Sequence, residues 1–205
     1  GDAGGVTNVG KSGDCRATGS RGGSLDENGR MIADSVGSCR AEVAEVVYDA
    51  EHFFDGYRRN PDDALRTLEA AVAAGAHWLT LCDTNGGMLP PWIGEIVSDT
   101  ADLGVRLGIH AHNDTGCAVA NTLAAVDAGA THVQGTVNGY GERTGNADLL
   151  AVVANLELKT GRGLLPGDGL AEITRIAHAI SEHTNSAPFA RQPYIGASAF
   201  AHKAG

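Results

Sequence analysis

A short apolar strand, a polar or glycine-rich turn and an amphipathic helix follow one another repeatedly through the middle of this sequence. The strand-forming runs begin near Val46, Trp78, Val105 and His132. Their starts lie about 27 to 32 residues apart, which is the length of one βα unit. Strands joined in this way run parallel. The pattern therefore predicts an α/β fold in which functional side chains lie in the turns that follow the strands.

The connecting helices can also be located from the sequence. One is expected over residues 61–75, with Leu65, Leu68 and Val72 on its buried stripe and Gly75 at its end. The other expected elements are a strand at residues 6–9, a helix opened by the capping box Ser24-x-x-Glu27, helices from Pro90, over 118–128 and over 169–183, and a last strand over 132–137. The stretch from Ala187 onward shows no core pattern and is predicted to be a linker.

Length, charge and hydropathy limit the function classes. The 205 residues suffice for one well-packed domain but fall short of the roughly 250 residues of a complete (β/α)8 barrel. A net charge of −10 without clustered basic residues disfavours nucleic acid as a partner. No apolar run approaches the roughly 20 residues that cross a bilayer, and no leader peptide or disulfide framework is evident. We therefore expect a cytoplasmic protein that binds neither nucleic acid nor membrane.

The most informative motif is His-Ala-His-Asn-Asp at residues 110–114. His110 and His112 alternate at the end of a predicted strand, so their imidazoles share a face and can hold one metal ion. Asn146, about one βα unit further on, is expected as a third ligand, although it could instead cap a helix that starts at Ala147. The remaining histidines are interpreted as structural or surface residues: His52, His77, His132, His178, His183 and His202.

Five stretches from Ser24 to the end carry a family resemblance: EVVYDAEHFFDGY, LCDTNGGMLP, HAHNDTGCAVANTLAAVDAGA, QGTVNGYGERTGNADL and RQPYIGASAFAHKAG. They resemble the metal-dependent barrel enzymes that include 2-isopropylmalate synthase, homocitrate synthase, citramalate synthase and the hydroxymethylglutaryl-coenzyme A lyases. The likeness is strongest to the citramalate synthases. Before Ser24 the sequence departs from the family, with Gly13 and Arg16 where relatives carry a tryptophan and a histidine.

The resemblance implies a partial (β/α)8 TIM barrel, roughly strands four to eight. Residues 1–160 would form the C-terminal portion of the catalytic domain, with residues 1–23 poorly ordered or degenerate. Residues 161–205 would begin a helical linker beyond the barrel. The family's first strand, with its arginine and its aspartate metal ligand, would lie outside this sequence. We therefore expect the 205 residues alone to be inactive.

The resemblance also implies an activity. It is that of an acyltransferase, which condenses acetyl-CoA with a 2-oxo acid, pyruvate to citramalate, in isoleucine and other branched-chain amino acid biosynthesis. The addition would be metal-assisted, with Mn²⁺ or Mg²⁺ as the ion and Zn²⁺ as a further candidate, and thioester hydrolysis would complete it. The whole protein would be a homodimer. Three alternatives remain open: a 2-isopropylmalate synthase-like enzyme, a lyase of the same family, or a non-catalytic remnant of a barrel.

Two turns supply the other candidate residues. Glu51, at a strand end, is the candidate general base or polar organiser, with Tyr48 as a weaker candidate. Thr84 resembles the residue that hydrogen-bonds the carboxylate of the oxo acid, and Gly86, with Gly87, would let the backbone approach that group closely. The structural alternatives are a solvated ion pair between Glu51 and Arg58 or Arg59, and helix-capping roles for Asp83 and Thr84.

A glycine-rich loop precedes the candidate ligand Asn146. Gly139, Gly141 and Gly145 are expected to make a tight turn that directs the asparagine, with Glu142 and Arg143 holding the loop by pairing. Cys82 and Cys117 are interpreted as small packing residues and not as nucleophiles.

Overall fold

A computed structural model describes residues 4–12 and 24–202 of the chain. The chain divides into two compact units, Gly1–Gln134 and Gly135–Gly205. Gly13, Cys15 and Arg16, and with them the altered turn noted in the sequence, lie outside the described residues. Within the described ranges, no helix has the length and apolar character needed to cross a membrane.

The first unit is built on a five-stranded parallel sheet in the order β1-β2-β3-β4-β5, so neighbouring strands in the sheet are also successive in the chain. The strands are β1 Gly5–Lys11, β2 Glu45–Glu51, β3 Trp78–Asp83, β4 Arg106–Ala111 and β5 His132–Gln134. The predicted parallel α/β fold is confirmed. Strand β1 confirms the strand expected at residues 6–9, and β5 stops before residue 137 because the chain turns there into a 3₁₀ helix.

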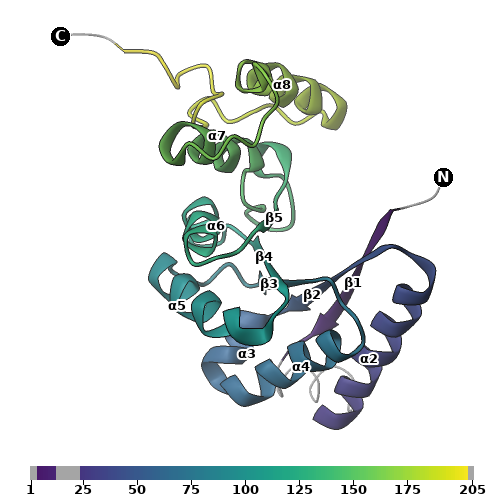
Figure 1. Ribbon diagram of the computed structural model, residues 1–205. Helices are drawn as coiled ribbons and strands as arrows, with labels where there is room; N and C mark the ends of the chain where they lie inside the picture. The colour runs from purple at the N-terminus through teal and green to yellow at the C-terminus, as the bar shows by residue number, and fades with distance from the viewer. Residues whose placement is uncertain (1–3, 13–23, 203–205) are drawn as a thin grey trace. The chain divides into compact units, whose positions relative to one another are not determined.

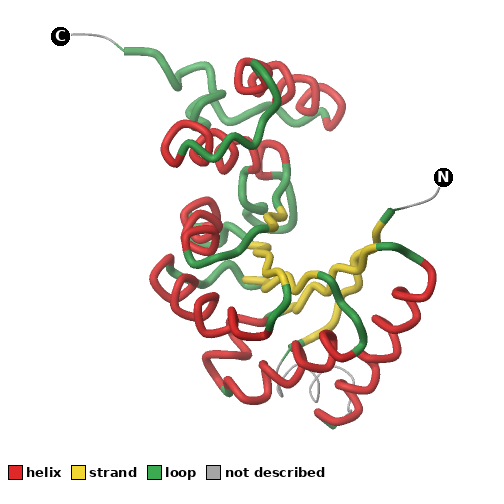
Figure 2. Tube along the Cα trace, in the orientation of Figure 1, coloured by secondary structure: helices red, strands yellow, loops and turns green. Residues whose placement is uncertain are grey.

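Helices cover one face of this sheet (Figures 1 and 2). They are α2 Leu25–Glu42, α3 Phe53–Arg59, α4 Pro61–Ala73, α5 Pro90–Thr100, the 3₁₀ helix η1 Ala101–Leu103, and α6 Ala118–Asp127. The predicted cap of α2 is present, because the Ser24 hydroxyl accepts a hydrogen bond from the Glu27 amide. Helix α3 was not predicted. It is a separate short helix because Asn60, which lies between α3 and α4, has an extended backbone conformation that ends the first helix before the second begins.

The buried face of α4 differs from the predicted one. It consists of Ala64, Thr67, Leu68 and Ala71, while Leu65 and Val72 are only half-buried. Small side chains let the helix lie close to its neighbours, and the Thr67 hydroxyl bonds both Ala64 O and Ser12 Oγ, at 2.7 and 3.3 Å. The predicted stripe consisted of the largest apolar residues, and it therefore lies to one side of the face of the helix that is buried.

The two faces of the sheet have different chemistry. Side chains alternate along each strand, and in-register neighbours in parallel strands share a face. The helix-covered face carries the buried residues Val46, Tyr48, Ala50, Leu79, Leu81, Leu107 and Ile109. The opposite face carries polar residues that come from several strands, namely Asp49, Glu51, Thr80, His110 and Gln134. The candidate site residues Glu51 and His110 therefore lie on this polar face of the sheet.

The second unit is helical. It contains the 3₁₀ helix η2 Val137–Gly139, α7 Leu149–Thr160, the 3₁₀ helix η3 Gly169–Glu172 and α8 Ile173–Thr184. Its core consists of Leu150, Ala154, Ile173, Ala177 and Ile195. Helix α7 starts at Leu149 with Asp148 as its N-cap, so the alternative in which Asn146 caps a helix at Ala147 is wrong.

The stretch after Ala187 belongs to this core. Ile195 is one of the core residues, and the Gln192 amide donates to Asp148 Oδ2 at 2.8 Å and to Asn138 Oδ1 at 3.2 Å. Ile195 thus makes core contacts that the sequence did not reveal, because isolated anchor residues leave no periodic signal, and the linker beyond the barrel stays a prediction. The boundary at residue 160 between barrel and linker rests on family register and stays a prediction.

Candidate metal and substrate site

The two histidines of the HAHND motif lie together in the first unit. Their ring centroids are 5.2 Å apart, with an angle of 37° between the ring planes. Two imidazoles that bind one ion through nitrogens about 2.1 Å away have centroids about 5 Å apart, so this spacing suits a shared ion. His110 lies near the end of strand β4, and the His112 amide donates to Asp83 O at 3.2 Å, which fixes the backbone beyond the strand.

Asn146 lies in the second unit at the end of the glycine-rich loop. Its amide nitrogen donates to Tyr140 O at 3.0 Å, while its Oδ1 atom is buried and accepts no hydrogen bond. A buried amide oxygen without a donor is costly, and a cation would satisfy it. The chemistry of these donors therefore fits a divalent ion. Among the described residues, no group of three or more histidine, cysteine, aspartate or glutamate side chains is placed to hold a metal ion.

The loop before Asn146 requires glycine. A Cβ at Gly145, where φ is +93°, would lie 1.9 Å from Gly139 O, and one at Gly141 would lie 2.3 Å from the Asn146 side-chain nitrogen. The Asn146 backbone amide in turn donates to Gly139 O at 3.1 Å. Glu142 and Arg143 are exposed and their side chains pair at 3.7 Å, while the Glu142 carbonyl accepts a hydrogen bond of 2.8 Å from the Gly145 amide within this turn.

Asp83 organises the turn after β3. Its side chain is fully buried and accepts hydrogen bonds from the Gly87 and Met88 amides at 3.1 and 3.2 Å. Burial raises the pKa of Asp83, while the two amide donors act in the opposite direction. Helix α5 begins only at Pro90, with Leu89 as its N-cap, so neither Asp83 nor Thr84 caps a helix.

Thr84 joins this turn to the end of β2. Its hydroxyl oxygen accepts a hydrogen bond of 2.8 Å from the amide of His52, a residue in the left-handed region with φ 59°. The hydroxyl of Thr84 therefore has one structural role already, and any bond to a substrate carboxylate would use its hydrogen.

Gly86 allows a close approach within the chain. Its φ is +61°, and a Cβ there would lie 2.5 Å from Asp114 Oδ2 and 2.7 Å from the Asp114 amide. The turn after β3 thus packs directly on the HAHND turn, and the Thr115 hydroxyl donates to Gly86 O at 2.8 Å. Gly86 has a structural reason to be glycine whether or not substrate binds nearby.

Gly86→Ala is expected to lower the free energy of unfolding by about 1 to 3 kcal/mol, because the new methyl group meets backbone and the positive φ is strained. Gly87→Ala is the matched control: no atom lies within 4 Å of the place its methyl group would take, and its φ is not positive. Chemical denaturation of both variants measures the difference. Equal stabilities would show that the contact with Asp114 relaxes freely.

Glu51 and Tyr48 occupy opposite faces of the sheet. They are three residues apart on β2, so their side chains alternate to different sides. Tyr48 is fully buried on the helix face, against Gly10, and burial raises its pKa well above the ordinary range. This is the environment of a core residue, and its hydroxyl is badly placed to exchange a proton with groups on the polar face.

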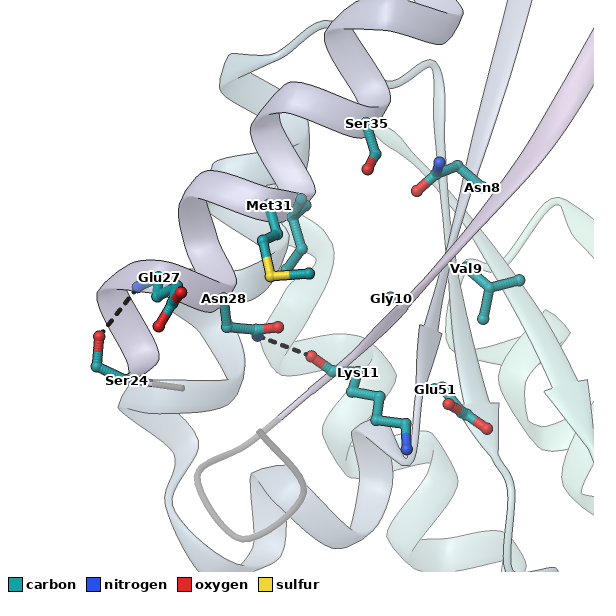
Figure 3. Close-up of a pocket in the computed structure, with 11 residues that line it drawn as sticks. Asn8, Val9, Gly10, Lys11, Ser24, Glu27, Asn28, Met31, Ser35 and Glu51 are labelled. Atoms are coloured by element: carbon teal, nitrogen blue, oxygen red, sulfur yellow. Dashed lines mark hydrogen bonds between the residues drawn. The ribbon is translucent and has the colours of Figure 1, made fainter. Parts of the chain in front are cut away.

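Glu51 is partly exposed and reaches a cavity. The Glu51 carboxylate lies 4.0 Å from His52 Nε2. The Arg58 guanidinium stacks on the Trp92 ring at 3.8 Å instead of pairing with Glu51. The cavity, of about 260 Å³, lies between β1 and α2 (Figure 3). Its lining also includes Asn8, Val9 and Lys11, and does not include either histidine of the motif.

Comparison with known proteins identifies the family. Residues 15–180 match the family model described as HMGL-like. The chain belongs to the HMGL-like family. This HMGL-like chain is 62% identical over 182 residues to an (R)-citramalate synthase of Streptomyces coelicolor, an alignment that covers 88% of the chain and 34% of that protein. It is 38% identical over 180 residues to a 2-isopropylmalate synthase of Brevibacillus brevis, covering 80% of the chain and 35% of the relative.

A solved structure supports the fold. The hydroxymethylglutaryl-CoA lyase from Pseudomonas aeruginosa superposes with a TM-score of 0.74 at 17% identity, covering 90% of the HMGL-like chain and 64% of the lyase. The chain spans about a third of the length of the two synthases. The activity of a whole synthase is accordingly a proposal for this chain.

Proposed function

We propose that this chain carries part of the active site of an acyltransferase that condenses acetyl-CoA with pyruvate to citramalate. The observation that carries the proposal is the 62% identity to an (R)-citramalate synthase, which contrasts with 38% identity to a 2-isopropylmalate synthase. The histidine pair, at a separation suited to one ion, supports metal-assisted chemistry at the carboxyl end of β4.

His110, His112 and the Asn146 side-chain oxygen would hold a divalent ion, Mn²⁺ or Mg²⁺. When bound, the ion would polarise the ketone of the oxo acid and make its carbon electrophilic. Thr84 would donate its hydroxyl hydrogen to the oxo acid's carboxylate. Asp83, through its bonds to the Gly87 and Met88 amides, would hold the turn that presents Thr84.

Glu51 would act as the general base on the polar side of the sheet. It would remove a proton from the methyl group of the acetyl thioester, and the resulting enolate would form the new carbon–carbon bond to the ketone carbon. Water would then cleave the thioester and release coenzyme A with a free carboxylate. Tyr48, buried on the other face, keeps a packing role in this scheme.

The remaining parts of the proposal follow from the same relationship. The whole protein would be a cytoplasmic homodimer that serves isoleucine biosynthesis, and the five strands of the first unit would be strands four to eight of its barrel.

A thiol-release assay on the intact protein that contains this chain tests the activity. With acetyl-CoA, pyruvate is expected to exceed 3-methyl-2-oxobutanoate in kcat/KM by about 10-fold or more, since each added methylene that a pocket must reject changes specificity by about that factor. A preference for the branched substrate would favour the 2-isopropylmalate synthase alternative. No release with any 2-oxo acid would contradict the acyltransferase proposal and favour a lyase or a non-catalytic remnant.

A further inference from the structure

The side chain of Gln134 connects His110 to the buried polar face of the sheet. Gln134 ends β5 and pairs in register with His110 on β4, so both side chains lie on the same face. Its Oε1 atom lies 2.7 Å from His110 Nδ1. Its Nε2 atom donates to Asp49 Oδ1 on β2 at 2.9 Å and approaches Thr80 Oγ1 on β3 at 3.4 Å. Four strands thus contribute to one hydrogen-bonded chain.

The orientation of the Gln134 amide is set by Asp49. A carboxylate only accepts hydrogen bonds, so the amide nitrogen must face Asp49 and the amide oxygen must face His110. Asp49 is largely buried, at 8% exposure; burial raises its pKa, while the hydrogen bond from Gln134 favours its charged form. Turning the amide around would place two acceptors against each other in a site with little access to water.

An amide oxygen facing His110 Nδ1 determines the tautomer of the ring. Nδ1 must carry the hydrogen in order to donate to Oε1, and the neutral ring then presents an unprotonated Nε2. Nε2 is the nitrogen that remains for a metal ion. Histidine ligands in proteins commonly donate their other ring N–H to an oxygen in this way, which fixes the ring and raises its basicity.

We propose that Gln134, oriented by Asp49, is a positioning residue that holds His110 as its Nδ1–H tautomer with Nε2 ready to bind a divalent ion. The inference rests on the metal site of the proposed function and deepens it. The hydrogen-bonded chain lies within the first unit alone and requires no bound substrate.

The first test reads the tautomer directly. In the metal-free protein with ¹⁵N-labelled histidine, the His110 signals are assigned by their loss in His110→Gln. We expect a protonated Nδ1 and an unprotonated Nε2. Gln134→Leu removes the acceptor and should give a mixture of tautomers, and Asp49→Asn should give a partial change, because an asparagine accepts or donates and no longer fixes the amide. Asn155→Leu, which deletes an amide in α7 bonded to Ala151 O and Tyr194, is the control and should change nothing.

The second test reads metal affinity by calorimetry with Mn²⁺. Gln134→Leu should weaken binding about 10- to 100-fold, whereas Asn155→Leu should stay within about 2-fold of the starting protein. A protonated Nε2 in the starting protein, an unchanged tautomer in Gln134→Leu, or an altered tautomer with unchanged affinity would each overturn the inference. The tautomer and the Mn²⁺ affinity are both measured without acyl transfer. A negative thiol-release assay would therefore contradict the proposed function without deciding the role of Gln134.

Discussion

Replacement of His110 or of His112 by alanine is expected to weaken Mn²⁺ binding by on the order of 100-fold or more, because each variant deletes one of the two nitrogen donors on a shared ion. The ring centroids are 5.2 Å apart, so the remaining imidazole of each variant cannot reach the coordination position that the deleted one occupied. Acyl transfer by the intact protein should fall by a comparable factor. Mn²⁺ should also bind more tightly than Mg²⁺, since imidazole is a softer ligand than oxygen.

Calorimetry on the starting protein and both variants measures this effect. His178→Ala is the matched control, because His178 is an exposed residue of α8 with no assigned ligand role. His110→Ala should unfold at a lower temperature than His178→Ala, because it leaves Gln134 Oε1 without its partner at 2.7 Å, so thermal unfolding without metal is measured for each variant to confirm that it is folded at the temperature of the calorimetry. Equal Mn²⁺ affinity in all three variants would remove the metal site from the proposed function.

Thr84→Val is expected to raise KM for the 2-oxo acid by roughly 10- to 150-fold, which corresponds to loss of a hydrogen bond to a charged group worth about 1.5 to 3 kcal/mol. KM for acetyl-CoA should change little. The substitution keeps the shape of the side chain but also deletes the acceptor of the His52 amide, a bond of 2.8 Å. A loss of stability is therefore expected alongside the kinetic effect.

Thr84→Ser separates the two roles, because it retains an oxygen that can accept from His52 and a hydrogen that can donate to a carboxylate. Its KM values should stay near those of the starting protein. Denaturation and steady-state kinetics on both variants measure stability and substrate binding independently. If KM for both substrates rises equally in Thr84→Val, the threonine supports the turn and does not recognise the carboxylate.

The sequence by itself determined the fold class and the histidine pair. Strand-length apolar runs at intervals of one βα unit leave few alternatives to a parallel sheet, and the two-residue spacing of His110 and His112 at a strand end places both rings together. The same alternation is enough to separate Tyr48 from Glu51, since an odd spacing on a strand puts two side chains on opposite faces.

Only the tertiary structure decided the contacts between residues that are distant in the chain. Asp49 and Gln134 are 85 positions apart, and no local pattern shows that they share a hydrogen bond across the face of a sheet. The requirement for glycine at position 86 is likewise set by Asp114 on the next turn, and the role of Ile195 by a core that its own segment does not reveal. Periodicity reports which side of an element is buried, whereas the partner of each side chain depends on strand register and on loop packing, which local sequence does not encode.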